Sequence, residues 1–184
     1  LMSIDYAELS ITTNFSFLRG ASHPGDLVAE ALRLNHCGIG IADRNTVAGV
    51  VRAYAALKAN KIDPARLPSP KDDLTAFKLA AGARLAFVDG TPDILAYPQN
   101  RAGWGRLCRL LASGNLRAEK GNCHLRLDDL LAHAQNLLLI AMPLEDTNMS
   151  RVGRRADYPP LLLIHDPDDP DSPYAATARL AAAW

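Results

Sequence analysis

One stretch near the N-terminus, residues 6–24, constrains the fold more than any other part of the sequence. Residues 6–11 are short, apolar and partly β-branched, which is typical of a strand, and the Thr, Asn and Ser residues that follow tend to end one. A glycine then permits a sharp turn, and Ser22 or His23 ahead of Pro24 provides a helix cap. The stretch therefore predicts a strand, a polar loop and a helix. In α/β folds, a loop in this place usually carries the functional residues.

The same order of strand, polar loop and helix occurs a second time. Apolar residues at helical spacing predict a helix over residues 24–35, and a buried strand at residues 39–42 then ends on Asp43. Thr46 is expected to cap a second helix, whose inner side would carry Val47, Val50, Val51, Tyr54 and Leu57. This alternation predicts a parallel sheet with crossover helices.

The remaining segments predict further elements of an α/β fold. Residues 63–76 carry prolines and charges without periodicity, which indicates an inserted surface loop. The expected strands are 77–81, 84–88, 94–97 and 137–142, and the expected helices are 101–112 and 127–135. No element is clear over 144–158, whereas 161–164 predicts a strand and 174–184 the start of a helix.

Composition narrows the setting in which this chain acts. A length of 184 residues suffices for one domain with a core, and the formal charge of zero favours no particular partner. The three cysteines, Cys37, Cys108 and Cys123, are widely spaced, which predicts buried thiols in a reducing compartment. No segment has the pattern of a signal peptide or a membrane span. We therefore expect a cytoplasmic protein without a membrane partner.

Several runs of sequence, in order over residues 6–142, resemble one family. They are NFSFLRGASHP at 14–24, ADRNTVAGVVRA at 42–53, GARL at 82–85, GRLCRLL at 105–111 and EKGNCHL at 119–125. These runs are similar to the polymerase-and-histidinol-phosphatase (PHP) domain, which occurs at the N-terminus of bacterial C-family polymerases and in metal-dependent phosphoesterases. Within the family, the similarity is greatest to the error-prone, damage-inducible polymerases.

The resemblance implies a distorted β/α barrel, TIM-like and of the PHP type. Such a barrel needs more chain than 184 residues, so we expect it to be incomplete here. Residues 1–184 are then a single PHP-type domain with the insertion at 63–76. Residues 144–184 form its uncertain C-terminal part, and the barrel is expected to continue beyond the chain end.

The resemblance also implies a metal site whose ligands this sequence has largely replaced. Active members hold divalent metals with His, Asp and Glu, and an arginine has no lone pair to offer a cation. The matching positions here are Ser10, Thr12, Arg19, Asp43, Arg44, Arg84 and Asp93. We expect a degenerate site in which the arginines pair with the aspartates, while affinity for a phosphate stays open. We expect His23 to be a helix cap or a hydrogen-bonded structural residue. We do not expect His124 to bind a metal.

One region is locally basic. It carries Arg101, Arg106, Arg109, Arg117, Lys120 and Arg126 against few acids. A solvated surface and contact with a nucleic-acid backbone both remain open for it.

The function implied by the resemblance is that of a non-catalytic N-terminal domain in an error-prone DNA polymerase that acts in translesion synthesis after DNA damage. No cofactor is expected in this segment, since the magnesium for nucleotidyl transfer would lie in the polymerase domain of a full-length protein. The implied partners are the remaining polymerase domains, DNA, a sliding clamp and accessory translesion proteins. Two alternatives stay open: an active metal-dependent phosphoesterase or 3′–5′ exonuclease, and a free-standing interaction module.

Overall fold

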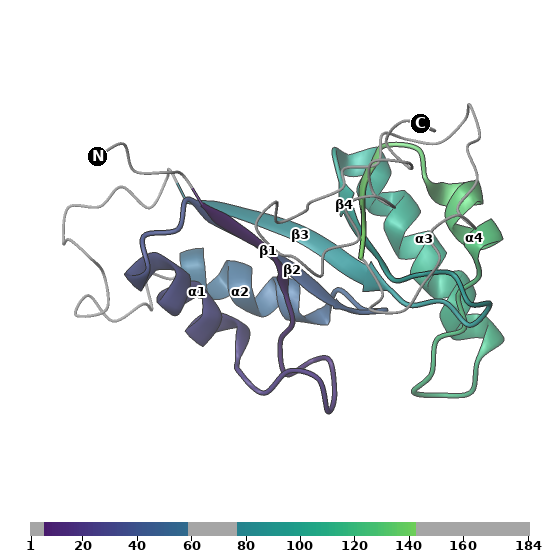
Figure 1. Ribbon diagram of the computed structural model, residues 1–184, viewed down its shortest axis with the longest axis horizontal. Helices are drawn as coiled ribbons and strands as arrows, with labels where there is room; N and C mark the ends of the chain where they lie inside the picture. Colours follow the sequence, from purple (N-terminus) through teal and green to yellow (C-terminus); the bar gives the residue numbers. More distant parts are fainter. Residues whose placement is uncertain (1–5, 59–76, 143–184) are drawn as a thin grey trace, which may run out of the picture. The chain divides into compact units, whose positions relative to one another are not determined.

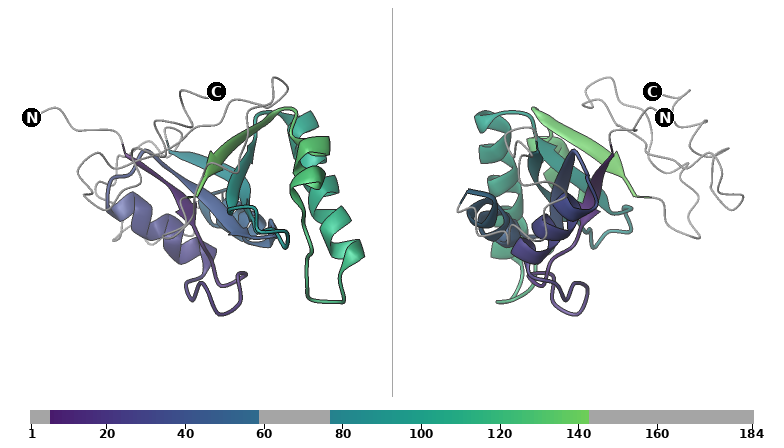
Figure 2. Two further views of the ribbon diagram at one scale, coloured as in Figure 1. Left: turned by 45° about the vertical axis from the view of Figure 1, so that its right-hand side comes forward. Right: turned by 90° about the vertical axis from the view of Figure 1, so that its left-hand side faces the viewer.

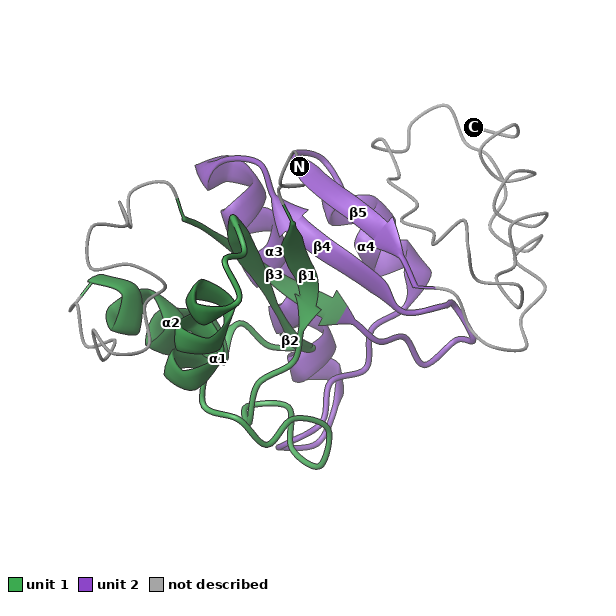
Figure 3. Cartoon of the chain, turned by 60° about the vertical axis from the view of Figure 1, so that its left-hand side comes forward, with its two compact units in different colours: residues 1–84 green, residues 85–184 purple. Residues whose placement is uncertain are grey.

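The computed structural model describes residues 6–58 and 77–142 of the chain (Figure 1). The chain forms two compact units, residues 1–84 and residues 85–184 (Figure 3). The predictions for 63–76, 144–158, 161–164 and 174–184 lie outside the described residues.

The described residues of unit 1 form the two predicted β/α repeats and one further strand. Its elements are β1 (Ala7–Ile11), α1 (Pro24–Arg33), β2 (Gly38–Arg44), α2 (Ala48–Lys58) and β3 (Lys78–Leu85), the last of which ends one residue into unit 2. Strand β2 lies in the middle and pairs in parallel with both β1 and β3. The two helices lie side by side on one face of these strands (Figure 2). The prediction of a parallel sheet with crossover helices is confirmed.

The core of unit 1 lies between the helices and alternate residues of β2. Ile39 and Ile41 are 1% and 0% exposed and pack against Val28 of α1 and Ala53 of α2. Because side chains alternate along a strand, the next residue in this series, Asp43, also faces the helices. The fold thus places a carboxylate at the end of an apolar row.

Helix α2 buries only part of the predicted face, since Val50 and Leu57 pack against the core but two of the other predicted residues do not. Val51 and Tyr54 are 69% and 53% exposed, whereas Gly49 and Ala53 are buried. The apolar residues of this helix are nearly continuous, so their spacing could not select a face. Thr46 lies one residue before the N-cap position, and its hydroxyl accepts a bond from the Ala48 amide, the first of the helix, at 3.2 Å.

Helix α1 begins at Pro24 as predicted, but without a side-chain cap. His23 occupies the N-cap position and makes no capping bond. Its ring Nδ1 lies 3.2 Å from the side-chain nitrogen of Asn14 instead. The fixed backbone of Pro24 suits the first helical turn, so the helix can begin without a capping side chain.

The described part of unit 2, residues 85–142, contains two paired strands and two helices. They are β4 (Ile94–Pro98), α3 (Arg101–Arg117), α4 (Leu127–His133) and β5 (Leu137–Ala141), and β4 pairs antiparallel with β5. The Asn100 side chain caps α3 by accepting from the Gly103 amide at 3.0 Å. Leu107, Leu110 and Leu130 are fully or almost fully buried.

Two element boundaries in the prediction are wrong. Residues 78–85 form one continuous strand in place of separate strands at 77–81 and 84–88, and beyond its end Phe87 makes only a single bridge to Leu125. Helix α3 continues past the predicted end at 112 to Arg117. Gly114 lies within this helix, and a Cβ there would lie 2.6 Å from Cys123 Sγ.

The cysteines are not the buried thiols that the sequence suggested. Cys37 is exposed, and Cys108 and Cys123 are partly exposed. Cys37 directly precedes β2, outside the apolar row of that strand.

Among the described residues, no helix has the length and apolar character needed to cross a membrane.

Candidate functional site

The carboxyl end of β2 carries a buried carboxylate that binds the loop after β1. Asp43 is 0% exposed. Its Oδ1 accepts from the Thr13 amide at 2.8 Å and from Ser16 Oγ at 2.7 Å, and its Oδ2 accepts from Thr13 Oγ1 at 2.8 Å. A buried carboxylate is tolerated when several donors satisfy it. We call Asp43, Thr13 and Ser16 the Asp43 clasp.

Further hydrogen bonds fix the shape of the loop. Ser16 Oγ accepts from the Arg44 amide at 2.9 Å, and the Ser16 carbonyl accepts from the amides of Arg19 and Gly20 at 2.9 and 3.0 Å. Gly20 lies so close to the main chain of Thr13 that a Cβ would lie 2.6 Å from the Thr13 carbonyl carbon. The loop is therefore an ordered structure attached to the end of β2.

Helix α2 approaches the clasp through a glycine. A Cβ on Gly49 would overlap Asp43 Oδ2 and lie 2.7 Å from Thr13 Oγ1. Both neighbours are held by the hydrogen bonds of the clasp, so they cannot move aside cheaply. The glycine lets the start of α2 close over the carboxylate and exclude water.

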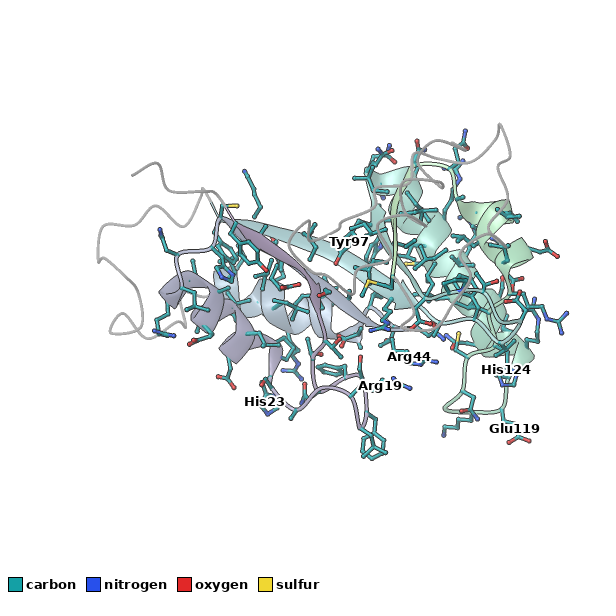
Figure 4. The ribbon with its side chains drawn as sticks, viewed as in Figure 1. Arg19, His23, Arg44, Tyr97, Glu119 and His124 are labelled. Carbon is teal, nitrogen blue, oxygen red and sulfur yellow. The ribbon has the colours of Figure 1, made fainter. Side chains whose placement is uncertain are left out.

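The arginines predicted to mark a lost metal site lie at the same edge of unit 1. Arg44 ends β2 and is paired in register with Arg84 of β3. Paired residues of parallel strands project from the same face, and this face is opposite to that of Asp43. Arg19 is exposed on the loop beyond β1, and Figure 4 shows it and Arg44 at this end of the unit.

The remaining predicted positions lie on β1, in the loop that follows it and in unit 2. Ser10 is exposed at the end of β1, where its hydroxyl donates to Glu8 Oε1 at 2.6 Å. Burial raises the pKa of Glu8, but the bonds from Ser10 and Tyr6 outweigh it and hold that pKa below its usual range. Thr12 is partly buried. Asp93 belongs to unit 2, where its carbonyl accepts from the Met142 amide at 2.9 Å.

The described residues do not fit a cluster of divalent metals. The oxygens of Asp43 already accept three hydrogen bonds from neutral donors, in place of the arginines that the sequence suggested as its partners. Ser10 and Thr12 offer neutral hydroxyls, which are weak ligands for a divalent cation beside carboxylates or imidazoles. Within residues 6–58 and 77–142, no group of three His, Cys, Asp or Glu residues is placed to hold a metal ion.

Thr13 and Ser16 are the site residues that sequence reasoning missed. They were assigned only to a polar loop. Hydroxyls at this spacing, in a loop that follows one strand and precedes a neighbouring strand ending in Asp, are a signal for such a clasp, because both loops meet at one edge of a parallel sheet.

Some of the basic residues of unit 2 are engaged within the unit. Arg117 forms a two-pronged ion pair with Asp129 at 2.6 and 2.8 Å and also donates to the His124 carbonyl. Arg106 donates to Gln135 Oε1 at 2.5 Å. The other predicted nucleic-acid contacts, all exposed, are Arg101, Arg109, Lys120 and Arg126. Figure 4 shows His124 and Glu119 on the loop that follows α3.

Comparison with known protein families shows which family the chain belongs to. The family model described as "PHP domain" matches residues 8–180, and the chain belongs to this family. The expected α/β fold of the PHP type is confirmed by this membership and by the β/α repeats of unit 1.

The relatives that match by sequence are DNA polymerases. An error-prone DNA polymerase of Rhodopseudomonas palustris strain BisB5 is 56% identical over 138 residues, which are 75% of this chain and 11% of the relative. The corresponding protein of strain HaA2 is 59% identical over 127 residues, covering 69% of this chain and 10% of the relative. Error-prone DNA polymerase 1 of Rhizobium meliloti is 51% identical over 143 residues, covering 77% and 12%. The chain thus spans about a tenth of the length of these relatives.

Two solved structures show weaker similarity. One is from Bifidobacterium adolescentis and is described as a predicted metal-dependent phosphoesterase, with a TM-score of 0.42, 24% identity, and coverage of 62% of this chain and 36% of the other. The second is an amidohydrolase from Chromobacterium violaceum with bound sulfate, with a TM-score of 0.40, 18% identity, and coverage of 60% and 33%.

Proposed function

We propose that this chain is the PHP domain of an error-prone DNA polymerase that acts in translesion synthesis after DNA damage, and that the domain is structural rather than catalytic. The sequence relatives support the first part, since they carry this region within polymerases about ten times its length. The residues at the carboxyl edge of unit 1 support the second part.

The observation that carries the proposal is the register between Arg44 and Arg84. The two arginines occupy neighbouring strand ends on one face, where the family resemblance implies metal ligands. At about 4 Å and an effective dielectric near 20, one fixed positive charge opposes a divalent ion by roughly 8 kcal/mol. Arginine stays protonated at any relevant pH, so this repulsion cannot be relieved by titration.

The proposed parent protein supplies what this domain lacks. Nucleotidyl transfer, with magnesium, belongs to another domain of the polymerase. The PHP domain supports that domain and thereby the placement of DNA, and a sliding clamp and accessory translesion proteins are further partners. The setting is the cytoplasm, where bacterial DNA is copied.

Metal loading tests the proposal directly. The purified chain is dialysed against Mn²⁺ or Zn²⁺, its metal content is measured by mass spectrometry, and hydrolysis of a chromogenic phosphodiester and of a single-stranded oligonucleotide is followed. We expect no stoichiometric metal and no metal-dependent hydrolysis. Stoichiometric binding together with hydrolysis would replace the structural function with that of a phosphoesterase or exonuclease.

A further inference from the structure

The loop after β1 presents an unusual set of side chains to solvent. Phe17 and Leu18 are 84% and 89% exposed, and Phe15 is 42% exposed. Leu18 has a positive φ of 60°, a conformation that turns the chain sharply at the tip of the loop. The Asp43 clasp and the bonds of Ser16 fix the main chain from which these side chains project.

The surroundings of these aromatic rings are positively charged. Residues 9–25 contain Arg19 and no acidic residue. Ser16 is hydrogen bonded to the main chain of both Arg19 and Arg44, which brings the tip of the loop to the end of β2. Arg84 follows in register on β3, and its carbonyl accepts from the Asn45 amide at 2.9 Å. We call Phe17, Arg19, Arg44 and Arg84 the arginine edge.

The carboxylate at the end of β2 does not face solvent. Asp43 is 0% exposed and faces the helices. Arg44 and Arg84 make further interactions of their own, so the inference depends on the net charge of the edge and not on vacant donors. Arg19 is exposed on the loop.

We infer that the arginine edge binds single-stranded DNA, with a base stacked on Phe17 and backbone phosphates beside the arginines. Surfaces that bind single strands combine an aromatic platform with a cationic track for the backbone. A strand with unstacked bases can use an exposed phenylalanine, whereas an intact duplex cannot. The choice of DNA as ligand rests on the proposed membership in a polymerase. The arginines that exclude a metal then have a use, which is to hold a phosphodiester without cutting it.

The test is fluorescence anisotropy with the 184-residue chain. The probe is a labelled oligothymidylate of about 16 nucleotides, the upper site size for such surfaces, in the presence of EDTA. We expect binding that weakens with salt, a preference over a duplex of equal length, and about tenfold weaker binding for Phe17→Ala. For Arg19→Gln, the slope of log affinity against log salt should fall by about 0.7, the value for one phosphate contact on a single strand.

Matched substitutions elsewhere in the chain serve as controls. Arg52→Gln and Tyr54→Ala, both exposed on α2, should leave the affinity and salt slope unchanged. Circular dichroism and melting curves establish that every variant is folded.

Three outcomes would overturn the inference. They are an absence of measurable binding at low salt, equal affinity in Phe17→Ala and the parent chain, or loss of binding in Arg101→Gln/Arg109→Gln with retention in the loop variants. The last outcome would move the contact to α3 of unit 2. Because the assay contains no metal and measures no hydrolysis, its failure leaves the structural function intact, and the metal assay can fail independently.

Discussion

At the scale of single residues, Asp43 is the group whose surroundings matter most. It is a charge with 0% exposure, and the three hydrogen bonds it accepts come from a main-chain amide and two hydroxyls. Without an acceptor of this kind, three donors would be left in a site from which water is excluded. The carboxylate therefore determines the local structure of the loop.

Asp43→Ala should destabilise the chain much more than Asp43→Asn. The alanine leaves the Thr13 amide and the hydroxyls of Thr13 and Ser16 without their acceptor, at a cost of about 3 kcal/mol or more. The asparagine keeps one acceptor oxygen, so its free energy of unfolding should fall by only about 1 kcal/mol. Urea denaturation measures both. Equal losses would mean that the bonds of the clasp contribute little beyond packing.

Gly49→Ala should also destabilise unit 1, by about 1–3 kcal/mol, because the added methyl group overlaps the clasp. Gly105→Ala is the matched control. A Cβ at Gly105 in α3 would meet only the end of the Arg109 side chain, at 3.7 Å. The gain in helix propensity should then stabilise the chain by about 0.5–1 kcal/mol. If both substitutions shift the denaturation midpoint in the same direction, the steric account is wrong.

At the scale of elements, α4 depends on two carboxylates. The Asp89 side chain accepts from the Leu127 amide at 2.8 Å, at the start of the helix. Burial raises the pKa of Asp89, but its hydrogen bonds from Leu127 and Thr91 outweigh it and hold that pKa below the usual value. The ion pair with Arg117 holds the pKa of Asp129 below the usual value as well. Both effects favour the ionised forms in the folded chain.

Stability linked to these groups should be lost in acid. A carboxyl group whose folded pKa is depressed contributes its stability above the unfolded value, here 3.8, and loses it as the pH falls through the folded value. Asp89→Asn should therefore be less stable than the parent at pH 7, and the difference should shrink below about pH 4. Melting temperatures from neutral to acid pH measure this. A difference that is independent of pH would exclude the linkage.

The elements of this chain were predictable where a pattern repeats, and less so where packing decides. The strand, loop and helix of residues 6–24 and the repeat that follows were predicted correctly, because polar loops separate short apolar runs. The buried face of α2 was predicted only in part, since apolar residues surround that helix. The end of α3 was also missed, and the close packing of Gly114 against Cys123 within that helix is a contact that sequence spacing does not show.

At the scale of the whole molecule, the question is whether the strand ends of unit 1 still form one site. The register pairs Arg44 with Arg84 near the ends of β2 and β3, although the sequence had placed Arg84 at the start of a separate strand. The role of Thr13 and Ser16 was missed, because their bonds depend on the path of a loop.

Restoring ligands should restore metal affinity. The variant carries Ser10→His, Arg19→Asp, Arg44→His and Arg84→Glu, and it replaces three cations with groups that donate lone pairs. Titration with Mn²⁺ should show a dissociation constant at least tenfold lower than that of the parent chain, which corresponds to about 1.4 kcal/mol. The control, Arg44→Gln/Arg84→Gln, removes charge without adding ligands and should gain far less. An unchanged affinity in a folded variant would show that these strand ends do not converge on one ion.

The clasp also changes how much length variation the chain can accept. Surface loops usually tolerate added residues, because few buried bonds depend on them. The segment between β1 and α1 is fixed at Thr13, Ser16 and Gly20. Extra residues there would break the hydrogen bonds to the buried Asp43 carboxylate instead of extending into solvent. A tag or inserted peptide would therefore be expected to unfold unit 1 here, although the segment has no regular secondary structure.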